Sequence, residues 1–144
     1  MAIGPHALVY PMFALALLTA LTLARLFRTR SRFVREGQAD ARYFLTYQDG
    51  GEPEASAKLA RHFTNLFEAP TLFYVACLAA MVTGQGSDVV IVALAWLYVA
   101  ARVVHTWVHT GRNVLPQRIA AYFTSWAFLM LLWLWVVLGV ASAG

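Results

Sequence analysis

The chain has 144 residues, of which 60% are hydrophobic and 12% are charged, a balance that excludes an ordinary water-soluble domain and favours one integral membrane domain over residues 1–144. Its formal net charge of +4 does not indicate a nucleic-acid partner, because eight of the eleven Lys and Arg residues lie between Arg25 and Arg61, in one connection. Such clustering is typical of a cytoplasmic loop beside membrane spans.

Four segments are long and apolar enough to cross a lipid bilayer, which takes about 20 mostly apolar residues. We expect these spans at about residues 5–27, 59–83, 89–107 and 119–140. The first segment carries its basic residues after the apolar stretch rather than before it, so we expect an uncleaved span and not a secretory signal. The sequence therefore predicts an all-α integral membrane four-helix bundle.

The connection at about residues 28–58 is the longest in the chain and carries charges of both signs. Its last part, GEPEASAKL, is typical of a loop that runs into a helix, with Pro53 near the first helical position and Glu54 favoured by the helix dipole. We therefore expect the second helix to begin several turns before its lipid-embedded part.

The two later connections are short. In the first of them, Ser87 or Asp88 can cap the third helix. The second, HTGRNVLPQR, carries Arg112 and Arg118 and no acidic residue. The first and third connections of a four-span bundle lie on the same side of the membrane, and here they hold nearly all the positive charge. We therefore expect both to be cytoplasmic and both termini to lie outside.

The second span carries polar side chains that are costly in lipid and usually mark a functional site. Arg61, Asn65 and Glu68 follow one another at i, i+4 and i+7, which places them on one helical face. Pro70 is expected to weaken or kink the helix. A structural alternative stays open, in which Arg61 and Glu68 only pair with each other.

The third and fourth helices carry similar stripes at the same end of the bundle. Arg102, His105 and His109 lie on one face of the third helix, and Arg118 and Tyr122 lie one turn apart at the start of the fourth. Several guanidinium groups beside an amide and a carboxylate suit a small zwitterion that carries two or more carboxylates. In the structural alternative, the arginines only reach toward the lipid headgroups.

A metal site is the weaker hypothesis for the two histidines of the third helix. His105 and His109 have the i, i+4 spacing of a helical metal pair, but a catalytic zinc needs a third ligand, for which Glu68 and His62 are the candidates. No HExxH motif is present, so we expect no metal. Cys77 lies in an apolar run and is expected to be a buried, inert thiol.

Taken together, these patterns resemble the membrane-associated proteins in eicosanoid and glutathione metabolism, the MAPEG family, and FEAPTLFY resembles its bacterial branch. The second-helix pattern of the family, Arg-x-x-x-Asn-x-x-Glu, is matched at residues 61–68 with a proline following. Its third-helix Arg-x-x-His is matched by Arg102 and His105, and its fourth-helix Pro-x-Arg by Pro116 and Arg118.

The resemblance implies a homotrimer in a bacterial inner membrane, with glutathione as cosubstrate at the interface between subunits. The implied reaction is a transferase or peroxidase-like one on a small apolar electrophile that arrives from the lipid bilayer. Catalysis is assigned to Arg118 and Tyr122. Glutathione binding is assigned to Arg61, Asn65, Glu68, Arg102, His105 and His109. Arg61, Asn65 and Glu68 of one subunit are expected to face Arg102 and Arg118 of its neighbour across the subunit interface.

Two positions depart from better-studied members of the family. His109 stands where the prostaglandin and leukotriene synthases have a tyrosine, and Ile119 stands where the prostaglandin synthase has a serine. These departures keep a second hypothesis open. The chain would then be a non-catalytic accessory subunit or a lipid-binding scaffold of a larger membrane complex.

Overall fold

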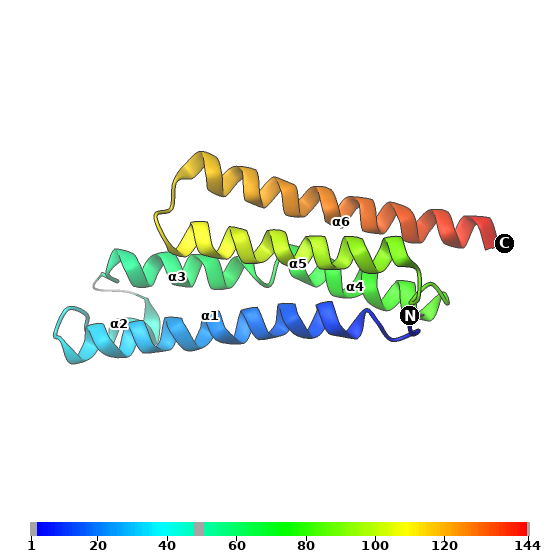
Figure 1. Cartoon of the computed structure of the whole chain (residues 1–144). Helices are drawn as coiled ribbons and strands as arrows, with labels where there is room; N and C mark the ends of the chain where they lie inside the picture. The colour runs from blue at the N-terminus through cyan, green and yellow to red at the C-terminus, as the bar shows by residue number, and fades with distance from the viewer. Residues whose placement is uncertain (1–2, 48–50, 144) are drawn as a thin grey trace.

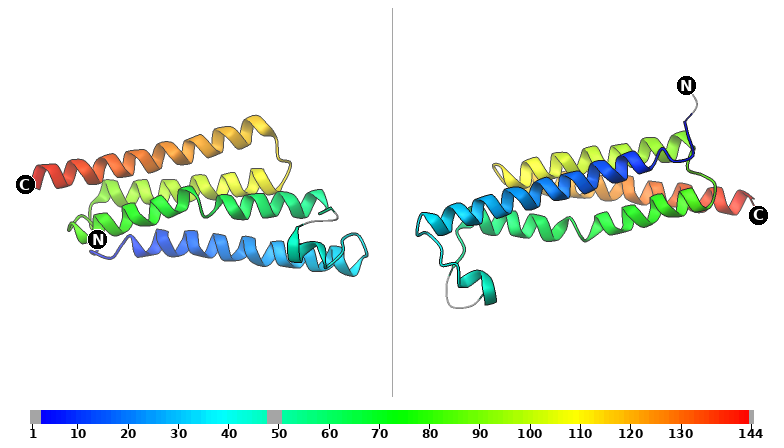
Figure 2. Two further views of the ribbon diagram at one scale, coloured as in Figure 1. Left: turned by 180° about the vertical axis from the view of Figure 1, so that it is seen from behind. Right: turned by 90° about the horizontal axis from the view of Figure 1, so that it is seen from below.

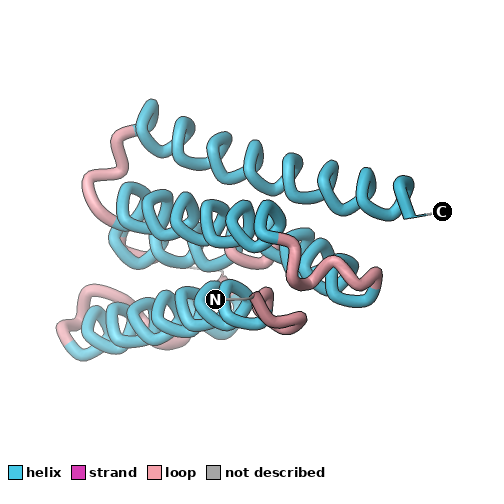
Figure 3. The backbone as a smooth tube through the Cα atoms, turned by 45° about the vertical axis from the view of Figure 1, so that its right-hand side comes forward, coloured by secondary structure: helices cyan, strands magenta, loops and turns pink. Residues whose placement is uncertain are grey.

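A computed structural model describes residues 3–47 and 51–143, and in this part of the chain it contains helices and loops but no strand (Figures 1 and 3). The helices are α1 (Val9–Arg35), α2 (Tyr43–Thr46), α3 (Glu54–Asn65), α4 (Ala69–Val82), α5 (Val89–Thr110) and α6 (Leu115–Ala143). Four stretches are long and apolar enough to cross a membrane, with α3 and α4 forming one of them. The predicted all-α fold with four membrane spans is therefore confirmed, and the chain is a multi-pass membrane protein.

The spans lie side by side, with both termini at one end of the bundle and the α1–α3 and α5–α6 connections at the other (Figure 1). Helix α6 packs mainly along α5, whereas α1 packs against α3, α4 and α5. Helix α2 lies at the connection end, set to one side of the bundle (Figure 2). Below, the "terminal half" of the bundle contains α4 and the "connection half" contains α3.

Arg30 connects α1 to the segment that precedes α3 through a hydrogen bond. Helix α1 continues to Arg35, so the first part of the connection expected at 28–58 is helical. The Nε of Arg30 donates a 2.8 Å hydrogen bond to Glu52 Oε1, just before α3 begins. The same guanidinium lies 4.7 Å from the ring centroid of Phe44, a cation–π contact that holds α2 against α1.

The second span is broken rather than kinked. Residues 66–68 separate α3 from α4, where one helix kinked at Pro70 was predicted. In a continuous helix the ring of Pro70 would collide with the carbonyl of Leu66, so the helix opens just before the proline. The backbone carbonyl of Phe67 is satisfied by the hydroxyl of Thr71, which donates a 2.6 Å hydrogen bond to it.

Asp88 caps α5. Its carboxylate accepts hydrogen bonds from the backbone N–H groups of Val90 and Ile91, at 2.8 and 2.9 Å. These bonds satisfy two of the amide donors that a helix start leaves without a partner. Of the two predicted candidates, Ser87 and Asp88, the structure therefore selects Asp88.

The turn between α4 and α5 packs closely against the N-terminal segment. Gly86 is buried in this turn, and a Cβ atom there would collide with the backbone oxygen of Pro5. The neighbouring Gln85 reaches α6, where its Nε2 donates a 3.1 Å hydrogen bond to the carbonyl of Val136. The turn thus connects three parts of the chain at the terminal end.

The apolar core fills the terminal half, where α1, α4, α5 and α6 meet. Phe73 of α4 stacks on Tyr98 of α5 with ring centroids 4.6 Å apart and an angle of 14° between the rings. Cys77 is fully buried in this core, as predicted. The remaining buried members are Leu8, Leu15, Ala69, Ala76, Ala80, Ile91, Ala95, Val99, Leu129, Leu132 and Val136. Most of the buried polar side chains lie in the connection half, beside a smaller number of buried apolar ones that includes Leu26, Phe33 and Leu59.

Candidate functional site

A cavity of about 530 Å³ lies in the connection half between α3, α5 and α6. This volume is within the range of small-molecule binding sites. Six of the eight predicted site residues line it, and Ile119 and Phe123 of α6 add an apolar wall. The six are Arg61 and Asn65 of α3, His105 and His109 of α5, and Arg118 and Tyr122 of α6.

The other two predicted residues, Arg102 and Glu68, each form a hydrogen bond with Asn65. The Nη2 of Arg102 donates hydrogen bonds to Asn65 Oδ1 at 2.7 Å and to the Asn65 carbonyl at 3.3 Å. The Nδ2 of Asn65 in turn donates a 2.9 Å hydrogen bond to Glu68 Oε2. All these contacts are made within one chain, because α3 and α5 of the same chain are packed neighbours. The expectation that Asn65 faces Arg102 across a subunit interface is therefore wrong for this pair.

Arg102 is the largest fully buried side chain of the described residues. Its Nε and Nη1 have no hydrogen-bond partner among them, and its contact with the Glu68 carboxylate runs through the amide of Asn65. A charge buried without direct pairing is costly, particularly in a membrane. This cost makes the Asn65 amide important both for stability and for the shape of the cavity.

Asn113 positions the arginine of α6. It follows α5 with φ of 54°, a left-handed conformation that asparagine tolerates better than most residues. Its Oδ1 accepts a 2.9 Å hydrogen bond from Arg118 Nη1. Asn113 was not predicted as a site residue, although an asparagine in the short connection before a candidate arginine was a usable signal.

Three buried histidines meet beside the cavity: His62 from α3, and His105 and His109 from α5. Their potential metal-ligand atoms all lie within 4.8 Å of one another. Thr106 contacts the group, because its Oγ1 lies 2.9 Å from His62 Nε2. The same Oγ1 donates a 2.8 Å hydrogen bond to the carbonyl of Arg102. The sequence indicates His62 only as a possible third metal ligand and does not indicate Thr106 as a site residue.

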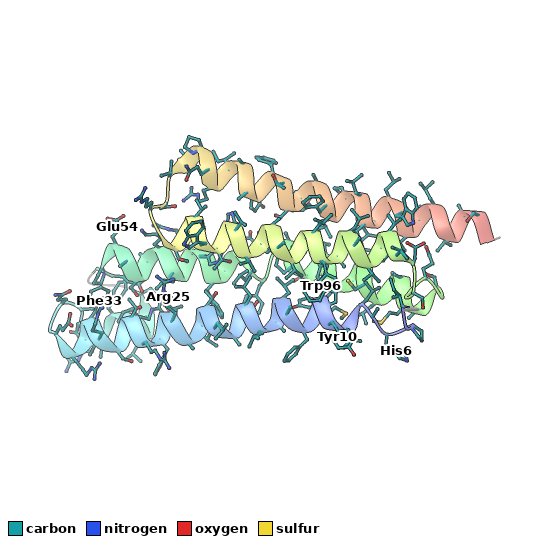
Figure 4. All side chains as sticks on the ribbon, in the orientation of Figure 1. His6, Tyr10, Arg25, Phe33, Glu54 and Trp96 are labelled. Carbon is teal, nitrogen blue, oxygen red and sulfur yellow. The ribbon has the colours of Figure 1, made fainter. Side chains whose placement is uncertain are left out.

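Two further contacts hold α5 to the rest of the connection half. Arg25 of α1 donates a 3.0 Å hydrogen bond from Nη1 to Thr110 Oγ1, and Lys58 of α3 donates one of 3.2 Å from Nζ to the Gly111 carbonyl. Figure 4 shows Arg25 on the half of α1 that is nearer the connections. The end of α5 that carries the histidines is thus held from both α1 and α3.

The family model described as the MAPEG family matches residues 8–138 of the chain. The match includes every residue that lines the cavity and most of each span. No curated protein matches the chain.

Proposed function

Because the chain belongs to the MAPEG family, we propose that it is a glutathione-dependent transferase or peroxidase-like protein that acts on small apolar electrophiles within the membrane. The observation that carries the proposal is that one cavity is lined by four side chains suited to glutathione, those of Arg61, Asn65, Arg118 and Tyr122. Glutathione offers two carboxylates, one ammonium group, amides and a thiol. The cavity offers two guanidinium groups, an amide and a phenolic hydroxyl, which are the kinds of groups that such a ligand requires.

In this proposal, the α3 side of the cavity holds the peptide part of glutathione. Arg61 binds a carboxylate, and Asn65 binds a backbone amide. Glu68 is exposed and hydrogen-bonded to Asn65, so its second carboxylate oxygen is available for the ligand's ammonium group. Arg102, His105 and His109 support the ligand from α5. Arg102 acts through Asn65, because its own side chain is fully buried.

The α6 side acts on the thiol. Asn113 holds the Arg118 guanidinium in place before a ligand enters, and a preorganised cation stabilises a thiolate without reorganising during the reaction. Tyr122 donates a hydrogen bond to the sulfur. The thiol releases its proton to water, and the resulting thiolate forms a sulfur–carbon bond with the electrophile, whose leaving group departs with the bonding electrons. The partly exposed side chains of Ile119 and Phe123 give the electrophile an apolar path from lipid.

We propose the assembly that the family resemblance implies and the orientation that the basic connections indicate. The chain forms a homotrimer in a bacterial inner membrane, with the connection end in the cytoplasm and both termini outside. The concentration of arginines at the α1–α3 connection supports this orientation. Large apolar side chains exposed along α1 and α6 support contact with lipid and with neighbouring copies, among them Tyr10, Phe13, Phe27, Phe123 and Leu134.

Calorimetric titration of glutathione into the purified protein in detergent tests the proposal. We expect binding by the wild type and at least about tenfold weaker binding by Arg61→Ala and Glu68→Ala, because each loses a hydrogen bond to a charged group. Arg112→Ala serves as the control, because Arg112 is an exposed arginine of the α5–α6 connection that does not line the cavity. A wild-type protein that does not bind glutathione would contradict the proposal.

The alternative function is that of a non-catalytic accessory subunit or lipid-binding scaffold in a larger membrane complex. Ile119 favours it, because this residue places an apolar side chain directly after Arg118 in the cavity wall. The alternative predicts stable copurification with a larger complex and no thiol-dependent turnover. Conjugation of glutathione to a model aryl halide by the purified protein would exclude it.

A further inference from the structure

The three buried histidines are arranged around a common centre. The ring centroids of His62, His105 and His109 are 5.5, 4.9 and 5.4 Å apart in the three pairs. Three imidazoles bound to one tetrahedral metal ion have centroids about 5 Å apart, given a metal–nitrogen bond of about 2.1 Å and a ring radius of about 1.1 Å. The spacing of the three rings therefore already matches that of a three-histidine metal site.

Hydrogen bonding determines which nitrogen of His62 is free. Thr106 Oγ1 donates its only hydrogen to the Arg102 carbonyl at 2.8 Å, so in its 2.9 Å contact with His62 it accepts from Nε2–H. A neutral His62 ring then carries its lone pair on Nδ1, which is buried and has no partner among the described residues. Metal-binding histidines commonly have this arrangement, in which the second ring nitrogen donates to a protein oxygen.

Together with His105 and His109, His62 gives four buried imidazole nitrogens that have no partner among the described residues. Leaving so many polar atoms unpaired in one cluster is costly for a purely structural group. In a tetrahedral site the ligand nitrogens lie about 3.4 Å apart. The potential ligand atoms here lie within 4.8 Å of one another, so small side-chain rotations would close the site.

We propose that His62, His105 and His109 bind one zinc-class transition-metal ion, with the fourth coordination position open to the cavity. Neutral imidazole is a preferred ligand of Zn²⁺, Ni²⁺ and Cu²⁺, and three protein ligands with one open position are typical of catalytic zinc. The opening is assigned to the cavity because His105 and His109 line it. The spacing of His105 and His109 alone did not predict a metal, since only the packing of α3 on α5 brings His62 to them.

Neighbouring cations restrict what can occupy the open position. The buried Arg102 lies on α5 one turn before His105, and Arg61 and Arg118 line the cavity that His105 and His109 also line. A divalent ion adds further positive charge, so the open position favours an anion such as hydroxide or a thiolate. All three proposed ligands are imidazoles of the chain itself. The metal site therefore does not depend on the binding of glutathione.

Cobalt binding to the full-length protein tests this proposal. The protein is purified in detergent through a tag without histidines, treated with a chelator and titrated with Co²⁺. We expect one equivalent per chain, with the intense visible absorption of tetrahedral cobalt. His62→Ala and His105→Ala are expected to lose the bound ion. His6→Ala is the matched control, because His6 lies at the opposite end of the bundle (Figure 4), and it should bind as the wild type does.

Thr106→Val is a milder variant that removes the hydrogen-bond acceptor of His62 but keeps a side chain of similar size. It is expected to weaken cobalt binding about 10- to 100-fold while the circular dichroism and the elution volume stay unchanged. Wild-type protein without bound cobalt, or unchanged binding by His62→Ala, would overturn the metal site. These titrations contain no glutathione, so they test the metal site alone. A protein that binds cobalt here but does not bind glutathione in the calorimetric titration would overturn only the proposed transferase function.

Discussion

Arg102 of α5 donates a 2.7 Å hydrogen bond from Nη2 to the side-chain oxygen of Asn65, at the end of α3. This bond attaches a fully buried guanidinium to the point where the second span breaks. The same amide donates to Glu68, which is assigned to the ligand. A single asparagine therefore contributes both to holding the bundle together and to shaping the proposed binding site.

Removal of this amide is expected to destabilise the protein. Asn65→Leu should lower the free energy of unfolding by about 3–5 kcal/mol, because it leaves a buried charge without its partner. Arg102→Met removes the charge itself. The double variant should therefore cost less than the sum of the two single variants. Denaturant unfolding of the four proteins in detergent measures the difference, and strictly additive costs would contradict the pairing.

The two cavity arginines should affect different kinetic constants. Arg118→Ala is expected to lower kcat for glutathione conjugation about 100-fold, because it removes a preorganised group that stabilises the thiolate. Arg61→Ala should mainly raise the KM for glutathione, because it removes a contact that is equally strong in the ground state and the transition state. Steady-state kinetics with an aryl halide separates these effects. Equal changes in kcat and KM for both variants would refute the division of roles.

The capping of α5 by Asp88 predicts an effect on stability that does not involve the cavity. Asp88→Ala should lower the free energy of unfolding by about 0.5–2 kcal/mol, because it removes the acceptor of two backbone N–H groups. Ser87→Ala, at the exposed residue just before it, is the control and should change stability little. Thermal unfolding of both variants in the same detergent compares them, and equal melting temperatures would contradict the assignment of the cap.

The close packing of Gly86 against Pro5 predicts that a larger residue at position 86 destabilises the protein. Gly86→Ala should cost about 1–3 kcal/mol, because the new Cβ collides with the Pro5 carbonyl and the backbone must move. Gly51→Ala provides the matched control, since a Cβ there would meet no atom within 4 Å. Chemical unfolding of the two variants should separate them clearly, and a Gly86→Ala protein as stable as the control would disprove the close packing.

The proposed orientation can be tested by thiol labelling. Cys77 is fully buried, so an introduced exposed cysteine should dominate labelling by a membrane-impermeant maleimide. Ser87→Cys, between α4 and α5, should react from outside intact cells, whereas Gln38→Cys, just after α1, should react only after the membrane is permeabilised. The reverse pattern would show that the connection end faces outward and would contradict the charge argument.

The four spans and the polar faces were predictable from the sequence because both are local properties. Hydrophobicity over about 20 residues identifies a span, and helical spacing shows that Arg61 and Asn65 share a face. The position of the α5 cap was predictable to within two candidates for the same reason. These features depend on residues close together in the chain.

The remaining site features depend on how the helices are rotated against one another. Spacing within α3 cannot show that Asn65 meets Arg102 of its own chain, or that His62 completes a group with His105 and His109. The break before Pro70 also required the structure, since a proline predicts an irregularity but not its length. Each of these features arises from contacts between distant parts of the chain.

The apolar core and the cavity occupy different halves of the bundle. Substitutions in the cavity wall leave the stacked pair of Phe73 and Tyr98 untouched, and distant sites usually contribute independently to stability. Changes in the cavity wall can therefore alter what binds at one end of the bundle. The other end continues to keep the chain folded, so changes at cavity residues other than Asn65, which also supports Arg102, cost little stability.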